Sequence, residues 1–472
     1  MRRLALYLLP AIFVGILAAS WVTHGTGVIK NDVARNIFIP ETLTTQLQVK
    51  AAYNGRDIFF RYRWPTSRPG LYHDMLRFEG GKWARYGGSV AGPQPQGIYE
   101  DRVTMMVDDG SVPEFGRYGG YITVGDRMRF FTNQATAKEV AAHPYLGLKK
   151  KQTEVQKYLP ATRRDVNDWA SVVTEEELSR LRAAGYFIDL WHWRAHRSNP
   201  IDMSDDQFIA EHRYGDAGKA VFFTNWDPEK KQPRLMFDPQ KAGRTALAWD
   251  DLANRRLGFG DLYYLREDQA MPFNPEHAWK EGDTIPRRVL RPGDGSRADI
   301  SVVGKAEWRN GFWDVTLRRA MNTGQPLDDK AFLDKGFYST AFAVHRGAFG
   351  SRWHYVSLPV SLGLERDAQL KAVRFTGDLP HWEQPWTDVT LFYPGQISWG
   401  SLVAPRHAGS RFIAQGVPVR FRHSERQLAQ YGVQAEFANE IKRQWLLTLY
   451  AGLLLIAAFG VGLNLILVRE RA

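Results

Sequence analysis

The sequence predicts a mainly β protein, an antiparallel β-sandwich with helical insertions and terminal transmembrane helices. Three features of the 472 residues indicate this: 13% are aromatic, short segments of alternating character recur, and each end carries a long apolar run. Aromatic side chains favour strands, and alternation with a period of two is typical of a strand with one buried face. The apolar fraction of 44% lets a chain of this length bury a large core.

The first 22 residues predict a signal peptide or an uncleaved N-terminal signal anchor. Arg2 and Arg3 precede an apolar run from Leu4 to Val22, which is the usual order in such segments. The small residues of Leu17-Ala18-Ala19-Ser20 suit a cleavage site, whereas the apolar stretch continues to Val22. Both alternatives therefore remain open.

Residues 23–410 predict one exported β domain. Turn signals such as Asn54-Gly55 and Pro292-Gly293-Asp294-Gly295 separate the short apolar segments, which favours an antiparallel sandwich or barrel. The segments expected to form strands are 47–51, 58–64, 103–107, 220–223, 298–303, 311–318, 340–345 and 353–357.

Two helical insertions are expected in the exported part. Thr174-Glu175-Glu176-Glu177 has the spacing of a capping box and predicts a helix that continues toward Gly185. Residues 411–444 predict an amphipathic helical stalk, with a helix from Ser424 to Gln444 that leads into the membrane.

Residues 445–468 predict a transmembrane helix, because the run is long, apolar and interrupted only by Asn464. Arg469 and Arg471 lie in the following tail, residues 469–472, and two arginines precede the N-terminal run. The positive-inside rule then places both termini in the cytoplasm. The expected location is the bacterial inner membrane, with the main domain in the periplasm.

Composition and motifs exclude several classes of protein. The absence of cysteine rules out disulfides, thiolate metal sites and covalently attached c-type haem. No nucleophile elbow, zinc-protease motif, Walker loop or calcium loop occurs, and the acidic pairs Asp108-Asp109 and Asp205-Asp206 are expected to be turn features. The formal charge of +11 suits an acidic redox partner or anionic lipid better than nucleic acid, which an exported protein seldom meets.

The segment from Ile188 to Pro200 carries the strongest functional signal. On a strand, Trp191 and Trp193 point to one face and His192 and Arg194 to the other. The two indoles are expected to form a flat wall, and the histidine and arginine to meet an anion such as a haem propionate. The alternative is a core strand with buried tryptophans and a hydrogen-bonded histidine.

Several segments together resemble the haem-binding family of the ethylbenzene dehydrogenase gamma subunit, related to gamma subunits of dimethyl sulfoxide reductase-type enzymes and to other cytochromes. The similarity covers roughly Gln46 to Pro405. The segments that carry it are Asp101 to Met106, the Trp-His-Trp strand, Gly311 to Val315, His345 to Gly347 and Trp353 to Pro359.

The resemblance implies a β-sandwich that holds one haem between two axial side chains. It makes His354 the first candidate for an axial ligand, because this histidine stands where the gamma subunits carry a ligating lysine. Met128 is the first candidate for the second ligand, followed by Met106 and then Met105. Trp353 and Tyr355 are expected to pack on the porphyrin.

The sequence departs from relatives that attach haem covalently. Gly120, Val124 and Gly125 stand where those relatives have two cysteines and a histidine. Any haem is therefore expected to be non-covalent haem b.

The sequence thus predicts a membrane-anchored, b-type cytochrome-like protein that relays electrons in a respiratory chain. Its expected partners are redox proteins or subunits of a membrane complex, and it is expected not to be an enzyme. The alternative is a domain that has lost haem and serves as a binding or assembly subunit of a membrane redox complex.

Overall fold

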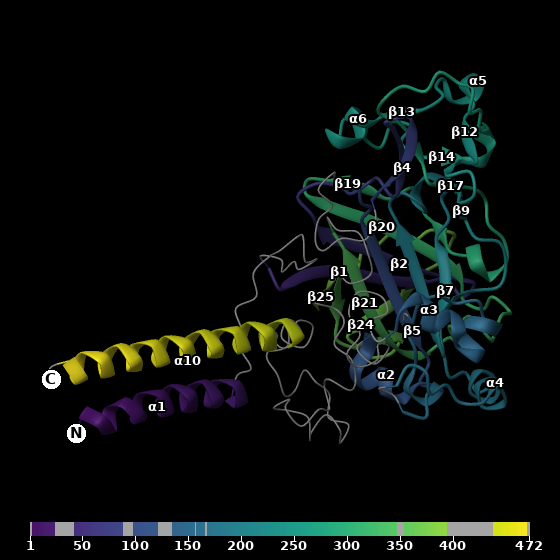
Figure 1. The fold of residues 1–472 in the computed structure, drawn as a ribbon. Coiled ribbons are helices and arrows are strands. Elements are labelled where there is room, and N and C mark those ends of the chain that lie inside the picture. The colour runs from purple at the N-terminus through teal and green to yellow at the C-terminus, as the bar shows by residue number, and fades with distance from the viewer. Residues whose placement is uncertain are drawn as a thin grey trace.

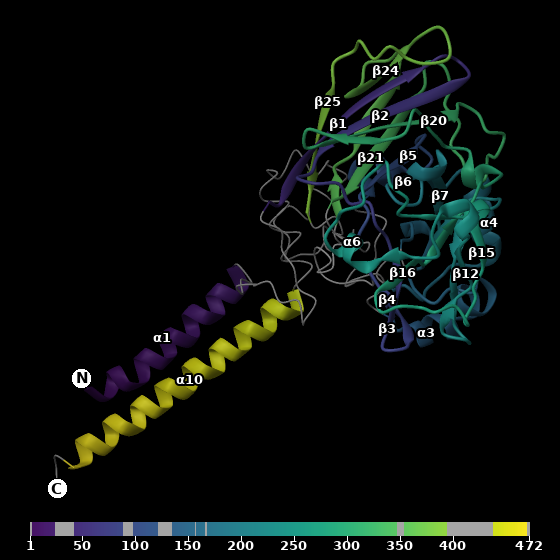
Figure 2. The ribbon, with the colours of Figure 1, turned by 90° about the horizontal axis from the view of Figure 1, so that it is seen from above.

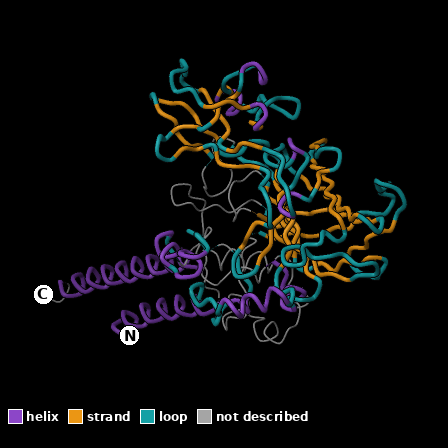
Figure 3. Tube along the Cα trace, turned by 90° about the vertical axis from the view of Figure 1, so that its right-hand side faces the viewer, coloured by secondary structure: helices purple, strands orange, loops and turns teal. Residues whose placement is uncertain are grey.

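The protein is mainly β and its sheets are largely antiparallel, which confirms the fold class predicted from the sequence. The computed structural model describes residues 2–23, 42–87, 98–120, 135–155, 157–165, 168–346, 354–393 and 438–469. Figures 1 and 3 show a strand-rich body and a separate pair of helices. The predicted stalk lies mostly outside the described residues.

The largest sheet has 14 strands, ordered β18-β20-β2-β1-β24-β23-β21-β5-β6-β7-β8, with β19, β22 and β25 attached along it. Most of its pairs are antiparallel, and β24 runs parallel to both β1 and β23. Its strands are β1 (Thr44–Tyr53), β2 (Asp57–Pro65), β5 (Arg102–Asp108), β6 (Ile188–Arg194), β7 (Asp205–Ile209), β8 (Arg213–Gly215), β18 (Ser301–Val302), β19 (Glu307–Arg309), β20 (Phe312–Ala320), β21 (Phe337–His345), β22 (His354–Ser357), β23 (Val360–Leu364), β24 (Leu370–Arg374) and β25 (Thr387–Phe392).

The sheet encloses the main core between its two halves. Strand β20 alternates strictly between buried and partly exposed side chains, as expected for a strand with one face against a core. Trp193 from β6 packs 5.9 Å from Trp64 of β2 and 5.1 Å from Trp313 of β20, measured between ring centroids. Truncating one of these indoles to alanine is expected to cost about 3–5 kcal/mol of stability.

Like every residue of the short strand β22, every residue of strands β5, β6 and β7 is buried. Their second face is covered by a smaller cluster that includes Val112, Phe115 and Tyr118 from around helix α2 (Pro113–Tyr118). The predicted turn at Asp205-Asp206 is wrong, since both residues lie on buried strand β7. Both faces of this part of the sheet can therefore hold buried polar groups.

Four smaller sheets lie beside the main one. The segments 220–223 and 298–303, expected to be strands, contain only parts of the short strands β9 and β18, and the second segment begins at the end of a 3-10 turn. The strands are β3 (Met75–Glu79), β4 (Lys82–Tyr86), β9 (Phe222–Thr224), β10 (Trp226–Asp227), β11 (Gln232–Pro233), β12 (Leu235–Phe237), β13 (Leu247–Ala248), β14 (Leu265–Arg266), β15 (Ala270–Pro272), β16 (Asp283–Pro286) and β17 (Arg288–Leu290).

Short helices connect the strands, and the predicted capping box at Thr174 opens one of them, with both of its reciprocal hydrogen bonds present. The α-helices are α3 (Ala137–Ala142), α4 (Glu175–Ala183), α5 (Pro239–Ala242) and α6 (Trp249–Ala253), and a π-helical turn spans Pro144–Lys149. Single 3-10 turns lie at Pro160–Thr162, Asn199–Ile201, Glu267–Gln269 and Ser296–Ala298.

The two terminal helices, α1 (Arg2–Thr23) and α10 (Ala438–Arg469), lie side by side away from the β body (Figures 1 and 2). Helix α10 is long and apolar enough to cross a membrane over Asn439–Leu465. The apolar part of α1 is shorter, Tyr7–Trp21. The helices touch through Trp21 and Trp445, whose ring centroids are 5.1 Å apart.

Candidate cofactor-binding site

A cavity lies on the second face of the main sheet, over strands β5, β6, β21 and β22. The hollow encloses about 560 Å³, a figure that includes the open solvent at its mouth. The side chains that line it are Arg102, Thr104, Met106, Lys157, Leu190, His192, Arg213, Ala341, Phe342, Ala343, His345, His354 and Val356, together with the backbone of Gly120.

The strand register explains the floor of the cavity. Val356, Ala343, Thr104 and His192 stand opposite one another across four neighbouring strands. Three of these four side chains are small, so the sheet surface between them is low and nearly flat.

The next row of the register is basic. His354 pairs with His345, His345 with Arg102, and Arg102 with Arg194. The imidazoles of His345 and His354 are stacked, with ring centroids 4.8 Å apart and planes 25° apart, and both residues are buried. The row on the other side of the floor holds Met106. Imidazole and thioether ligands are therefore both available in one cavity.

His192 is held in one tautomer by two arginines. Its Nδ1 accepts hydrogen bonds from Arg194, at 2.9 Å, and from Arg213, at 2.7 Å. A guanidinium only donates, so the imidazole proton must lie on Nε2. That buried atom has no hydrogen-bond partner among the described residues. Burial, followed by the charges of Arg194 and Arg213, lowers the pKa of His192 well below its usual value, so the ring is a neutral donor.

The cavity carries an excess of positive charge. Arg102, Arg213 and Lys157 line it, and none of its described lining residues is acidic. Burial, helped by the nearby Arg213, lowers the pKa of Lys157 to about 7. Arg102 is partly compensated by Glu100, whose carboxylate lies 3.3 Å from the arginine Nε. An anionic group is the ligand that this electrostatic environment favours.

Gly120 brings the chain close over the floor. A Cβ at this position would lie 3.4 Å from Val356 Cγ1 and 3.7 Å from the Met106 sulfur. In the alignment predicted from the sequence, Gly120 stands where relatives that attach haem covalently carry a cysteine. The residue at that point of the alignment thus does line the cavity, although Val124 and Gly125 lie outside the described residues.

The structure brings together some of the predicted site residues and separates others. His354, Met106 and His192 line the cavity, and Arg194 lies beside it, bound to Asp205 at 2.6 Å. The remaining candidates are Trp191, Trp193, Tyr355 and Met105, which lie in the main core, and Met128 and Trp353, which lie outside the described residues.

Trp191 and Trp193 do not wall the cavity, because they occupy the opposite face of β6 from His192. Tyr355 also points away and donates its hydroxyl proton to the backbone of Thr42. Met105 accepts a hydrogen bond from the Tyr62 hydroxyl within the core, at 3.3 Å. The indoles and this tyrosine therefore support the floor from behind.

Sequence reasoning missed His345, Lys157 and Arg213. His345 lies on a predicted strand, and its place opposite His354 follows only from the hairpin register. Arg213 belongs to the short strand β8, and Lys157 to a loop far from it in sequence. No local pattern marks them as neighbours of Met106.

Residues 20–357 match the family model described as Ethylbenzene dehydrogenase. The match covers well over half of the chain and ends at the last residue of β22, so it includes the four strands under the cavity. No curated protein matches the chain. The matched family is one of redox enzymes, so the prediction that the chain is not an enzyme is wrong.

Proposed function

The chain belongs to the ethylbenzene dehydrogenase family, and we propose that it binds one non-covalent haem b in the cavity over β5, β6, β21 and β22. With the haem bound, it carries electrons for an oxidoreductase anchored in a membrane. The observation that carries this proposal is the cavity itself: one flat floor with thioether and imidazole groups beside it and cationic side chains around it.

The residues present fit a haem. Methionine and histidine are common haem ligands, and His345, His354 and Met106 supply them here. The Nε2 proton of His192 and the charges of Arg102, Arg213 and Lys157 suit two propionates. A bound haem would supply a one-electron iron couple. The surrounding sheet would exclude water from it, and the cationic side chains would hold its acidic edge.

The membrane arrangement supports a fixed position for such a domain. Helix α10 is long and apolar enough to cross a membrane, which supports a membrane anchor. We propose that the β domain lies in the periplasm, with both termini in the cytoplasm, and that partner redox subunits of the same membrane complex exchange electrons with it. The arginines at both ends of the chain support this orientation.

The test is the visible spectrum of the full-length protein, purified in detergent from cells supplied with haem. We expect a Soret band and the pyridine haemochrome of haem b. Met106→Leu and His354→Ala should each alter the low-spin spectrum. His345→Ala tests the second imidazole, and the histidine that binds iron is the one whose loss abolishes the low-spin bands.

Met105→Leu is the matched control for Met106→Leu, because the two methionines are adjacent on β5 and face opposite sides. His196→Gln is the control for the histidines, since His196 is buried outside the cavity. A folded protein without a Soret band would instead support the haem-free binding or assembly subunit. Unchanged spectra in all three cavity variants would show that the haem does not bind in this cavity.

A further inference from the structure

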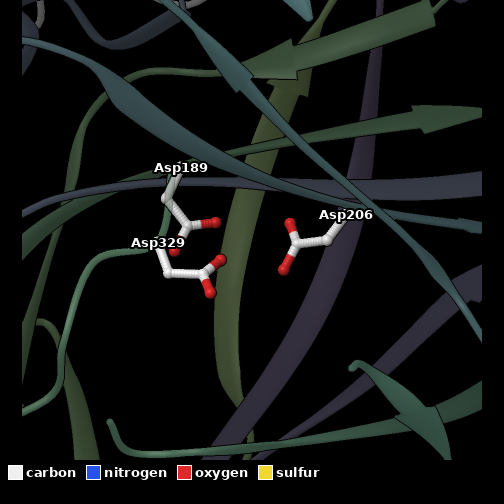
Figure 4. A group of neighbouring side chains, drawn as sticks. All are labelled: Asp189, Asp206 and Asp329. Atoms are coloured by element: carbon white, nitrogen blue, oxygen red, sulfur yellow. The ribbon is translucent and has the colours of Figure 1, made fainter. Parts of the chain in front are cut away.

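A cluster of buried aspartates lies on the opposite side of β6 from the cavity. Asp189 and Asp206 lie on the core face of β6 and β7, and Asp329 reaches them from the loop after β20 (Figure 4). One carboxylate oxygen from each of the three lies within 4.8 Å of the others. Asp216 follows β8, and its backbone N–H lies 3.4 Å from the Asp206 carbonyl oxygen.

Two more aspartates border this group. Asp328 accepts a hydrogen bond from the backbone N–H of Ala217, the residue after Asp216, at 3.0 Å. Asp299 lies against Asp206. The acidic cluster thus consists of Asp189, Asp206, Asp216, Asp299, Asp328 and Asp329.

Arg319 compensates part of this charge. Its guanidinium lies 2.7 Å from Asp189, 2.8 Å from Asp206 and 3.0 Å from Asp329, and it packs over the Trp191 ring. Among the described residues, it is the one basic side chain that forms an ion pair with the acidic cluster. The nearby Lys330 instead pairs with Asp108 and Asp109, on the far side. One guanidinium cannot balance six carboxylates.

Several carboxylate oxygens of the acidic cluster have no hydrogen-bond donor within the described part of the chain. Both oxygens of Asp216 are buried and have no hydrogen-bond partner among the described residues, and the residue is only 6% exposed. Asp189 Oδ1 and Asp328 Oδ1 are also buried and have no hydrogen-bond partner among the described residues. A buried carboxylate without a donor costs several kcal/mol unless a proton or a cation neutralises it, and an unseen ion is a usual explanation.

We propose that the acidic cluster binds one Ca²⁺ ion beside Arg319, with Asp189, Asp206 and Asp329 as its central ligands and Asp216 as a further source of negative charge. Calcium takes six to eight oxygen ligands at about 2.3–2.6 Å, so three carboxylate oxygens that all lie within 4.8 Å of one another can contact a single ion. Magnesium suits the site less well, because it retains several waters. No nitrogen or sulfur ligand is present that would select zinc.

A bound Ca²⁺ would tie β6 and β7 to the loop after β20, because Asp189, Asp206 and Asp329 come from these three elements.

The test uses the full-length protein in detergent. After treatment with a chelator, calcium alone and magnesium alone are added back, and both Tm and bound metal are measured. We expect about one calcium per chain by elemental analysis and a higher Tm with calcium than with magnesium. Asp216→Asn should reduce calcium affinity at least tenfold, because it removes charge but leaves the three ion pairs of Arg319 in place.

Asp202→Asn is the control, since Asp202 is an exposed aspartate paired with Lys305 away from the cluster. If Asp216→Asn does not fold, Asp328→Asn provides the same measurement. The proposal is overturned if the chelated protein neither binds calcium in equilibrium dialysis nor gains Tm from it. The result does not depend on haem, so the two proposals fail separately.

Discussion

Strand β6 separates two buried charged regions of opposite sign. On one face, His192 belongs to a cavity lined by Arg102, Arg213 and Lys157, and none of its described lining residues is acidic. On the other face, Asp189 belongs to a cluster of six aspartates with one compensating arginine. Buried charge of one sign is costly unless it has a counterion. The contrast indicates that each region favours a ligand of opposite charge. The cavity favours an anion, and the acidic cluster favours a cation.

Removal of Arg319 should disturb this arrangement most. Arg319→Met leaves three fully buried carboxylates without their partner, which costs about 3–5 kcal/mol by analogy with broken buried ion pairs. We expect a large fall in the midpoint of urea unfolding, or failure to fold. Arg61→Met is the control, because Arg61 forms a half-exposed pair with Asp314 that is worth at most about 1 kcal/mol. Equal losses in the two variants would show that the acidic cluster needs no internal cation.

Reversing one charge in the cavity should have the next largest effect. Lys157→Glu places a carboxylate beside the proposed propionates and should weaken haem binding about tenfold to a hundredfold, since charge-assisted hydrogen bonds contribute about 1.5–3 kcal/mol. The measurement is the rate of haem transfer to apomyoglobin. Lys150→Glu, on an exposed loop, is the matched control. A transfer rate that stays at the wild-type value would remove Lys157 from the binding site.

The pH dependence of stability tests the acidic cluster without a mutation. The folded-state pKa values of Asp216 and Asp329 are raised above those of the unfolded chain, to about 10 and about 7. The folded state therefore binds more protons than the unfolded state above about pH 4, and stability must fall as the pH rises toward these values. In the presence of chelator, Tm should decline between pH 5 and 9.

Calcium and one substitution separate the contributions to that decline. Added calcium should flatten the curve, because ionised carboxylates then have a counterion. Asp216→Asn should make the decline shallower between about pH 4 and 7, where Asp329 still contributes, and should remove it above about pH 7. A Tm that rises with pH in chelator would contradict the direction of these pKa shifts.

Much of the fold follows from local patterns, whereas the two charged regions do not. Alternation in β6 already separates His192 from Trp191, and the structure has the same division. It does not reveal which side holds a cavity, because both faces of β6 are buried. The polar face became the cavity wall, and the indoles joined the core.

The acidic cluster was still harder to foresee. Asp206 and Asp329 are more than a hundred residues apart, and only the packing of β7 against β20 brings them together. The pair Asp205-Asp206 resembles a turn because aspartates are rare inside strands. Buried arginines overrode that tendency: Asp205 pairs with Arg194, at 2.6 Å, and Asp206 with Arg319.

The smallest expected effect concerns the pair of terminal helices, which have no charged region between them. A Cβ on Gly452 of α10 would overlap the Phe13 ring of α1, so the close packing of the two helices depends on glycine. This contact gives α1 a packing partner in α10, as an uncleaved anchor would need. Because the chain has no cysteine, Trp21→Cys with Trp445→Cys should form a single intramolecular disulfide under mild oxidation.

Gly452→Leu should reduce this cross-linking and leave the haem spectrum and the calcium-dependent Tm unchanged, since both charged regions lie in the β domain. The yield of cross-linked chain is read on a non-reducing gel, and intact mass shows whether residues 1–22 are retained. A mature chain that begins near Trp21 would establish a cleaved signal peptide. The separation of the two charged regions by β6 would stand in either case, because it depends on the strand and not on the anchor.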